Sequence, residues 1–218
     1  QFSPVGATSA DEVPGVADEP VSCLGDLWML DEQCVLCGDA RDPDTYAAIL
    51  QGRLAAMVIT DSPYNVKVQG NVCGSGSIKH GEFVMASGEM SEKEFRGFLE
   101  AFSRNLLIST APGSLHYLFM DWRHLRVLQE VCDKLYGPQV NLCVWVKTNG
   151  GMGSLYRSRH ELVVVYKNGS APHVNNVQLG QYGRNRTNVW EYEGANSLSP
   201  ERRADLELHP TVKPVAMI

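Results

Sequence analysis

The sequence has no apolar run long enough to cross a membrane, since none approaches 18 residues. It also lacks a basic segment followed by an apolar one near its start, which is the pattern of a secretory signal peptide. We therefore expect a cytoplasmic protein with no membrane segment. Hydrophobic residues make up 44% of its 218 residues, which is enough to bury a core and excludes a wholly disordered chain.

Paired cysteines are scarce as well. Of six cysteines, Cys34 and Cys37 alone have a spacing typical of metal ligands. A four-ligand zinc site needs a second pair of ligands, so we expect no metal. Because a secretory signal is missing, we expect the thiols to be reduced.

Basic residues are missing from the first 32 positions, which hold seven Asp or Glu and no Lys or Arg. The net charge of −6 argues against a nucleic-acid partner, but it comes from this segment, because residues 33–218 hold 18 acids and 19 bases. Between residues 134 and 190, Glu161 is the single acid among seven Lys and Arg. The pattern predicts an acidic linker over 1–23 and a basic stripe suited to phosphate.

Strand-like and helix-like segments alternate over 24–218, which we treat as one domain. Apolar runs predict strands at 34–37, 55–60, 115–120, 140–146 and 161–166. Helical spacing predicts helices at 43–51, from the capping box at Ser91 to the break at Pro112–Gly113, and at 123–135. We expect a loop at 66–82 and irregular structure at 168–200. The alternation indicates an α/β fold with an open, mostly parallel, Rossmann-like sheet and helices on both faces.

Ligands bind beyond the carboxyl ends of the strands in such sheets, and Asp39, Asp61 and Asp121 each follow a predicted strand. The segment Asp-Ser-Pro-Tyr at 61–64 is the most informative. Its carboxylate and the Ser62 carbonyl could hold the two hydrogens of an exocyclic amine, while the Tyr64 ring stacks on the base. The alternative is an ordinary turn after a strand, since Asp, Pro and Tyr are common loop residues.

Three motifs occur in a fixed order: Gly-Asp at 38–39, Val-Ile-Thr-Asp-Ser-Pro-Tyr-Asn at 58–65 and His-Pro-Thr-Val-Lys-Pro at 209–214. Together they resemble the N4/N6-amino DNA methyltransferase family, in its permuted β class, where the catalytic motif precedes the cofactor motif. Segments at 25–28, 145–147, 156–161 and 183–190 resemble a bacterial and phage-borne subgroup. The resemblance covers about residues 24–218. It implies the fold of S-adenosyl-L-methionine-dependent methyltransferases, that cofactor, and double-stranded DNA as the partner.

The resemblance also implies roles for individual residues. The catalytic segment would be Asp61, Ser62, Pro63 and Tyr64. Cofactor contacts would come from Asp39, Ala40, Asp61, His209, Thr211, Lys213 and Pro214. The basic residues expected to contact DNA are Lys67, Lys79, Lys147, Arg157, Arg159, Arg184 and Arg186. The loop at 66–82 would close over DNA, and a homodimer is usual for the class.

Two departures from the family pattern stand out. Ser62 occupies a position that is usually Pro, although its backbone carbonyl survives the change. A Gly-rich cofactor motif is expected about 20–30 residues after 209–214, and the sequence stops before it. We therefore expect a fragment of a longer enzyme that binds the cofactor weakly by itself.

Asp at the first motif position favours N6-adenine as the methylated base, whereas Ser there is more typical of N4-cytosine enzymes. Two further hypotheses are a non-catalytic DNA-binding remnant and an amino-methyltransferase that acts on RNA or protein.

Overall fold

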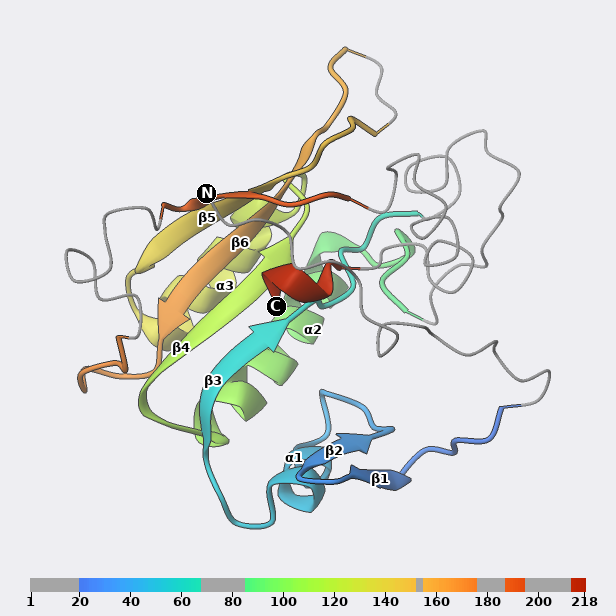
Figure 1. The fold of residues 1–218 in the computed structure, drawn as a ribbon, viewed down its shortest axis with the longest axis vertical. Coiled ribbons are helices and arrows are strands. Elements are labelled where there is room, and N and C mark those ends of the chain that lie inside the picture. Colours follow the sequence, from blue (N-terminus) through green and yellow to red (C-terminus); the bar gives the residue numbers. More distant parts are fainter. Residues whose placement is uncertain (1–19, 68–84, 152–154, 176–186, 195–212) are drawn as a thin grey trace.

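The computed structural model describes residues 20–67, 85–151, 155–175, 187–194 and 213–218. It confirms the α/β fold, with a five-stranded sheet and helices packed against it (Figure 1). Part of the predicted linker at 1–23 and most of the loop at 66–82 lie outside the described residues, so both stay predictions.

The sheet has the strand order β3-β4-β6-β5-β7. These strands are β3 (Ala55–Thr60), β4 (Thr110–Met120), β6 (His160–Lys167), β5 (Asn141–Val146) and β7 (Val189–Glu191). β3 runs parallel to β4, and β7 runs parallel to β5. β6 runs antiparallel to both of its neighbours. The carboxyl ends of β3, β4, β5 and β7 therefore meet the amino end of β6 at one edge, which we call the carboxyl edge.

Two long helices cover one face of this sheet. α2 (Glu92–Ile108) begins at a complete capping box, in which the Ser91 and Glu94 side chains each accept a backbone N–H from the other residue. Its buried residues recur at helical spacing, as the sequence predicts: Phe95, Phe98, Leu99, Phe102 and Leu106. α3 (Leu125–Tyr136) packs beside it and buries Val127, Leu128, Val131 and Cys132. Burial of each large side chain contributes roughly 1.5–3 kcal/mol.

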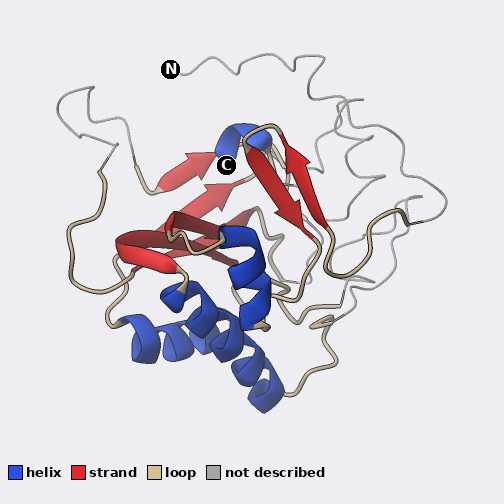
Figure 2. Ribbon diagram, turned by 90° about the horizontal axis from the view of Figure 1, so that it is seen from below, coloured by secondary structure: helices blue, strands red, loops and turns tan. Residues whose placement is uncertain are grey.

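The opposite face holds a second apolar cluster, formed by Phe119, Cys143, Trp145, Val163 and Val165. Among the described residues, Met217 of the short 3-10 helix η2 (Val215–Met217) packs against it. Figure 2 shows α2 and α3 on one side of the sheet and η2 on the other. α1 (Pro43–Leu50) follows the Asp42 N-cap, and a separate antiparallel hairpin, β1 (Leu27–Leu30) and β2 (Gln33–Leu36), precedes it.

The predicted end of the second helix and the prediction of irregular structure throughout 168–200 are wrong. The helix α2 ends at Ile108 and not at Pro112–Gly113, because the chain is already extended at Thr110, where β4 begins. Gly113 lies inside β4 with φ +88°, and a Cβ at this position would be 2.4 Å from the Pro172 carbonyl oxygen. A Pro–Gly pair usually ends a helix, but here it lies in the irregular first part of β4. The pairing of β4 with β3 shifts register in this part of the strand. β7 also lies within the segment expected to be irregular.

A buried polar network lies within β4, between the sheet and the two long helices. The fully buried His116 ring contacts Thr110 Oγ1 and Ser114 Oγ through Nε2, at 3.0 and 3.1 Å, and the Tyr136 hydroxyl through Nδ1, at 3.1 Å. Burial lowers the pKa of His116 to about 4, so the ring is neutral at physiological pH.

Candidate active site

The chain directions bring polar residues together at the carboxyl edge. Asp61 follows β3, Asp121 follows β4, and Lys147 follows β5. Glu161 lies at the amino end of β6, opposite Trp145 in the strand register. The crevice position expected for ligands in an open α/β sheet therefore carries several ionisable side chains.

Asp61 and Tyr64 of the predicted catalytic segment contact each other directly. The Tyr64 hydroxyl lies 2.6 Å from Asp61 Oδ1 and 3.0 Å from Glu161 Oε2. The Asp61 side chain is one-third exposed, at 34%, so its carboxylate remains accessible to a ligand. The Tyr64 ring is half-buried and packs against the clusters on both faces of the sheet. Burial first, and then Glu161 and Asp61, raise the pKa of the Tyr64 phenol well above its usual value, so the hydroxyl keeps its proton.

Asn65, directly after this segment, fixes the backbone in an unusual conformation. It is buried and has φ +54°. Its side chain donates to the Met90 carbonyl at 2.9 Å and accepts the N–H groups of Gly88 and Met90 at 3.0 and 3.2 Å. The catalytic segment is thus tied to the loop that leads into α2.

Further polar and aromatic residues follow the end of β4. The His124 ring packs edge-on against Phe95, with 5.1 Å between the ring centroids, and burial lowers the pKa of this imidazole. Nearby, Arg123 is bound to the Asp121 carboxylate at 3.0 Å. The guanidinium of Arg123 also lies 4.8 Å from the ring centroid of Trp122, whose side chain is exposed.

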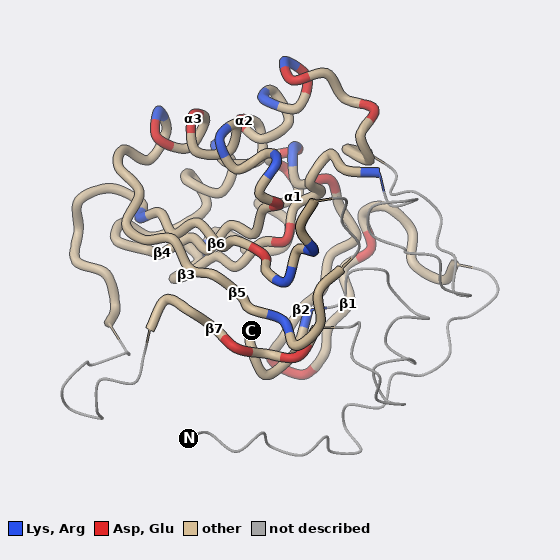
Figure 3. The backbone as a smooth tube through the Cα atoms, turned by 90° about the horizontal axis from the view of Figure 1, so that it is seen from above, with Lys and Arg blue, Asp and Glu red and all other residues tan. Residues whose placement is uncertain are grey.

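A charged cluster lies behind Asp61. Lys213 Nζ is 2.7 Å from Asp61 Oδ2 and 3.1 Å from Glu161 Oε2. Lys147 pairs with the other oxygen of Glu161. Burial alone would raise the pKa of Glu161, but Lys213 and Lys147 together hold it below its usual value. Burial would likewise lower the pKa of Lys213, and Glu161 and Asp61 raise it instead. Figure 3 shows basic and acidic positions gathered in this region, near the C-terminal turn.

The structure describes some of the residues expected to contact the cofactor. Asp39 forms a bidentate ion pair with Arg41, at 2.5 Å for the shorter contact, and this guanidinium lowers the pKa of the Asp39 carboxyl. The Ala40 carbonyl accepts hydrogen bonds from Tyr46 and Asn105. Lys213 is largely enclosed, with 10% of its side chain exposed, and Pro214 is buried. His209 and Thr211 lie outside the described residues.

An open hollow beside the Asp39 turn is lined by Arg41, Glu89, Met90, Glu94, Gly97 and Phe98. Met90 is also the residue to which Asn65 donates a hydrogen bond, so the loop before α2 contacts both this hollow and the end of the catalytic segment.

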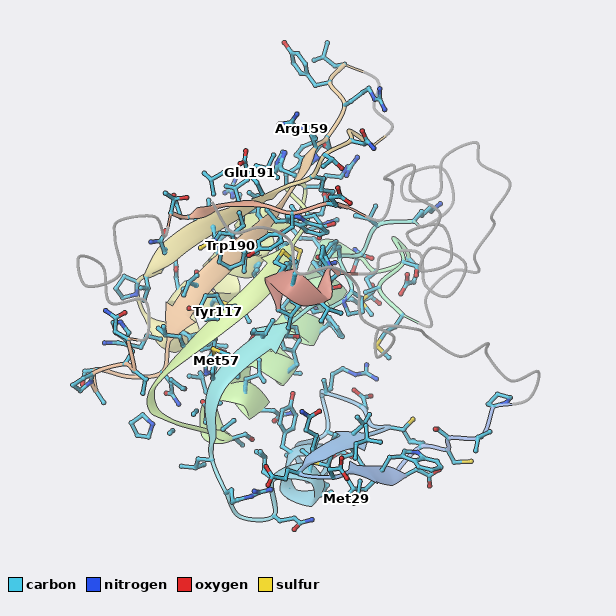
Figure 4. All side chains as sticks on the ribbon, in the orientation of Figure 1. Met29, Met57, Tyr117, Arg159, Trp190 and Glu191 are labelled. Atoms are coloured by element: carbon cyan, nitrogen blue, oxygen red, sulfur yellow. The ribbon has the colours of Figure 1, made fainter. Side chains whose placement is uncertain are left out.

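The basic residues expected at the DNA surface differ in their surroundings. Lys67 and Arg159 are exposed, and Arg159 lies at the foot of the projection between β5 and β6 (Figure 4). Arg157 is exposed too, but its guanidinium donates to the Gly150 and Gly151 carbonyls at 2.6 and 3.0 Å and so braces this projection. Lys147 is largely buried against Glu161, which differs from an accessible phosphate contact. Lys79, Arg184 and Arg186 lie outside the described residues.

Sequence reasoning did not include Glu161 or Asn65 in the site, although both contact its residues. One signal pointed to Glu161, since it is the single acid in the basic stripe at 134–190. Nothing in the sequence indicated that the Asn65 side chain ties the end of the catalytic segment to the loop before α2. Among the described residues, no group of three or more His, Cys, Asp or Glu side chains could hold a metal ion. No helix in the described ranges is long and apolar enough to span a membrane.

The family model described as DNA methylase, for N6- and N4-methylating enzymes, matches residues 55–218. Because this match covers most of the chain, the protein belongs to the N6/N4 DNA methylase family. S-Adenosyl-L-methionine is the cofactor that membership implies. The search of curated proteins returned no significant match.

Solved structures with a similar fold include the M1.HpyAVI–SAM complex, with 16% identity, a TM-score of 0.43, and coverage of 77% of this chain and 64% of that one. A Thermus thermophilus protein assigned as a DNA modification methylase has 16% identity, a TM-score of 0.45 and coverage of 71% and 65%. The PvuII cytosine-N4-specific DNA methyltransferase has 12% identity, a TM-score of 0.48 and coverage of 78% and 64%. The chain thus spans about two-thirds or less of these proteins, and the family match remains the basis of the assignment.

Proposed function

We propose that the chain forms the catalytic part of a DNA methyltransferase that acts on the exocyclic N6 amine of adenine. One observation carries the proposal: Asp61 is partly exposed at the carboxyl edge and bonded to Tyr64, within the segment matched by the family model. We also propose the permuted β-class order, because the catalytic motif at 58–65 precedes the motif at 209–214 in the chain.

The carboxylates of the site fit the cationic methionine end of the cofactor. Asp39 and Asp61 have side chains 35% and 34% exposed, so both remain accessible to a positively charged ligand. When bound, S-adenosyl-L-methionine supplies an electrophilic methyl group on its sulfonium. We expect Asp39, Ala40 and Asp61 to hold it, together with His209 and Thr211. Lys213 fits an indirect role better, since its ammonium group already meets Asp61 and Glu161.

The chain's own groups would orient the amine. Asp61 accepts one amine hydrogen, and the Ser62 carbonyl, restricted by Pro63, accepts the other. The nitrogen lone pair then points away from both acceptors, and the carboxylate offsets the positive charge that develops on nitrogen. Lys213 Nζ lies over the Tyr64 ring, 5.6 Å from its centroid, so we expect the base to stack on the opposite ring face.

Asp at position 61 supports adenine over cytosine, by the family pattern alone. We propose double-stranded DNA as the partner, with Lys67 and Arg159 as phosphate contacts, because both are exposed cations flanking the carboxyl edge. Arg157 would act mainly by holding the projection on which Arg159 lies.

The test is methyl transfer from labelled cofactor by the product of the complete reading frame. Labelled DNA, RNA and protein substrates are compared, and the DNA is digested to nucleosides. We expect N6-methyladenine from DNA. N4-methylcytosine would correct the base, labelled RNA or protein would correct the substrate, and DNA binding without any transfer would show a non-catalytic remnant.

A further inference from the structure

Glu161 is a largely buried carboxylate that three groups of the active site share. Its side chain is 14% exposed. Lys147 meets Oε1, while the Tyr64 hydroxyl and Lys213 Nζ approach Oε2 to 3.0 and 3.1 Å. A buried carboxylate is costly unless it is paired and hydrogen-bonded, and here both oxygens are engaged.

The strand directions explain how Glu161 reaches this site. β6 is antiparallel to its neighbours, so its first residues lie beside the last residues of β5 and β4. Glu161 is 97 positions from Tyr64 in sequence, yet the two side chains are in hydrogen-bond contact. No local pattern at 58–65 indicates this partner.

The Tyr64 hydroxyl has one proton and two carboxylate acceptors. It lies 2.6 Å from Asp61 Oδ1 and 3.0 Å from Glu161 Oε2, and a phenol donates one full hydrogen bond at a time. When Tyr64 donates to Asp61, it competes with the amine for the lone pairs of Asp61 Oδ1. When it donates to Glu161, this oxygen is released.

Lys213 occupies the other oxygen of Asp61. Its ammonium group bridges Asp61 Oδ2 and Glu161 Oε2. Without the charge on Glu161, Lys213 would be drawn more strongly to Asp61 and would compete with the amine. Glu161 therefore offers a second partner to both groups that occupy Asp61.

We propose that Glu161 is a positioning residue that draws the Tyr64 hydroxyl and Lys213 away from Asp61, so that Asp61 can accept the target amine. The inference rests on the proposed function. It assigns Glu161 an effect on kcat, because it acts when the amine is engaged and touches neither the DNA backbone nor the base.

Glu161→Gln tests this, since it keeps the size of the side chain and removes the charge. We expect kcat to fall about 10- to 100-fold, with KM and Kd for DNA within about twofold of wild type. Glu191→Gln is the matched control. Glu191 is an exposed acid at the end of β7, paired in register with Val146, and its substitution should leave kcat unchanged.

A double-mutant cycle with Tyr64→Phe separates positioning from a general structural role. Because Glu161 acts partly through the Tyr64 hydroxyl, the double variant should lose less than the product of the two single losses in kcat. Fold losses that simply multiply, or a wild-type kcat in Glu161→Gln, would overturn the proposal. Should Glu161→Gln fail to fold, Glu161→Asp withdraws the carboxylate by one methylene and takes its place in the cycle with the same expectation.

Measuring the same cycle by urea unfolding distinguishes failure of the proposed function from failure of the proposed role of Glu161. Coupling between Glu161 and Tyr64 in stability, with no methyl transfer by the wild type, would reject the proposed function and confirm the contact. Methyl transfer by the wild type, with no coupling in either measurement, would reject the role of Glu161 alone.

Discussion

Single side chains from distant parts of the chain hold the catalytic segment in place. Asp61 and Tyr64 bond to each other, Glu161 and Lys213 meet them from β6 and the C-terminal turn, and Asn65 fixes the exit of the segment. Such bonds restrict the segment where Ser62 has replaced the more rigid Pro of the family pattern. Because each contact involves one or two side chains, single substitutions can test the contacts one at a time.

The contribution of Asn65 to the free energy of unfolding has a backbone part and a side-chain part, which two substitutions can separate. Asn65→Gly retains the positive φ but loses three hydrogen bonds to the loop before α2, so we expect a loss of about 1–3 kcal/mol in the free energy of unfolding. Asn65→Ala also bears the cost of the left-handed backbone, about 1 kcal/mol more. Urea unfolding measures both. Equal stability of Gly and Ala variants would show that the backbone conformation relaxes.

At the scale of elements, much of the fold follows from sequence pattern. The strand predicted at 55–60 is confirmed, and the predicted helices at 43–51 and 123–135 agree with α1 and α3 within two residues. The capping box at Ser91 locates the start of α2 because its two side chains satisfy backbone donors locally. β7 and the early start of β4 were missed, since strand pairing with β5 and β3, and not local composition, stabilises them.

The same distinction applies to the site. The carboxylate and the aromatic ring of 61–64 were identified from a short motif. Glu161 and Asn65 were not, because their partners lie 97 and 23 to 25 positions away in the sequence. The contact of Glu161 also depends on β6, the antiparallel strand within an otherwise parallel arrangement.

The irregular start of β4 depends on Gly113. Gly113→Ala and Gly137→Ala both place a side chain at a positive φ, of +88° and +84°. A Cβ at 113 also meets the Pro172 carbonyl at 2.4 Å, whereas nothing lies within 4 Å at 137. Gly113→Ala should therefore destabilise the protein more than the control, which should lose about 1–3 kcal/mol because φ +84° and ψ −159° are a backbone conformation almost restricted to glycine. A smaller effect at 113 would mean that the 168–175 segment shifts freely.

The N-terminus of α2 provides a second test at this scale. Ser91→Ala removes the cap to the Glu94 N–H and should cost about 1 kcal/mol in unfolding free energy. Arg104→Ala removes an exposed ion pair with Glu100 on the same helix and should cost less than about 0.5 kcal/mol. Reversal of this order in urea unfolding would contradict the capping role.

For the whole molecule, acid stability should depend on the buried His116. Its pKa is lowered from 6.5 to about 4 in the folded state, so the unfolded chain binds a proton first as the pH falls. The stabilisation is complete above about pH 6.5 and is lost towards pH 4, by up to about 3 kcal/mol. His116→Gln should flatten this part of the curve of unfolding free energy against pH. A curve as steep as that of the wild type would assign the loss to other groups.

Net charge is a poor guide to the partner of this molecule. The −6 total comes from the acidic first 32 residues, while Arg159 and Lys67 are exposed cations flanking the carboxyl edge. Arg159→Ala should weaken DNA binding across sequences and reduce the dependence of affinity on salt. Binding measured between about 50 and 200 mM salt checks this, and an unchanged slope would remove Arg159 from the interface.

In the proposed reaction, Asp61 accepts a hydrogen bond from the target amine. The most direct measurement compares wild type with Asp61→Ala for methyl transfer from labelled cofactor and, in parallel, for DNA affinity. We expect transfer to be abolished while DNA affinity stays nearly intact, because the carboxylate serves the amine and not the phosphates. Retained transfer, or a collapse of DNA binding together with activity, would contradict it.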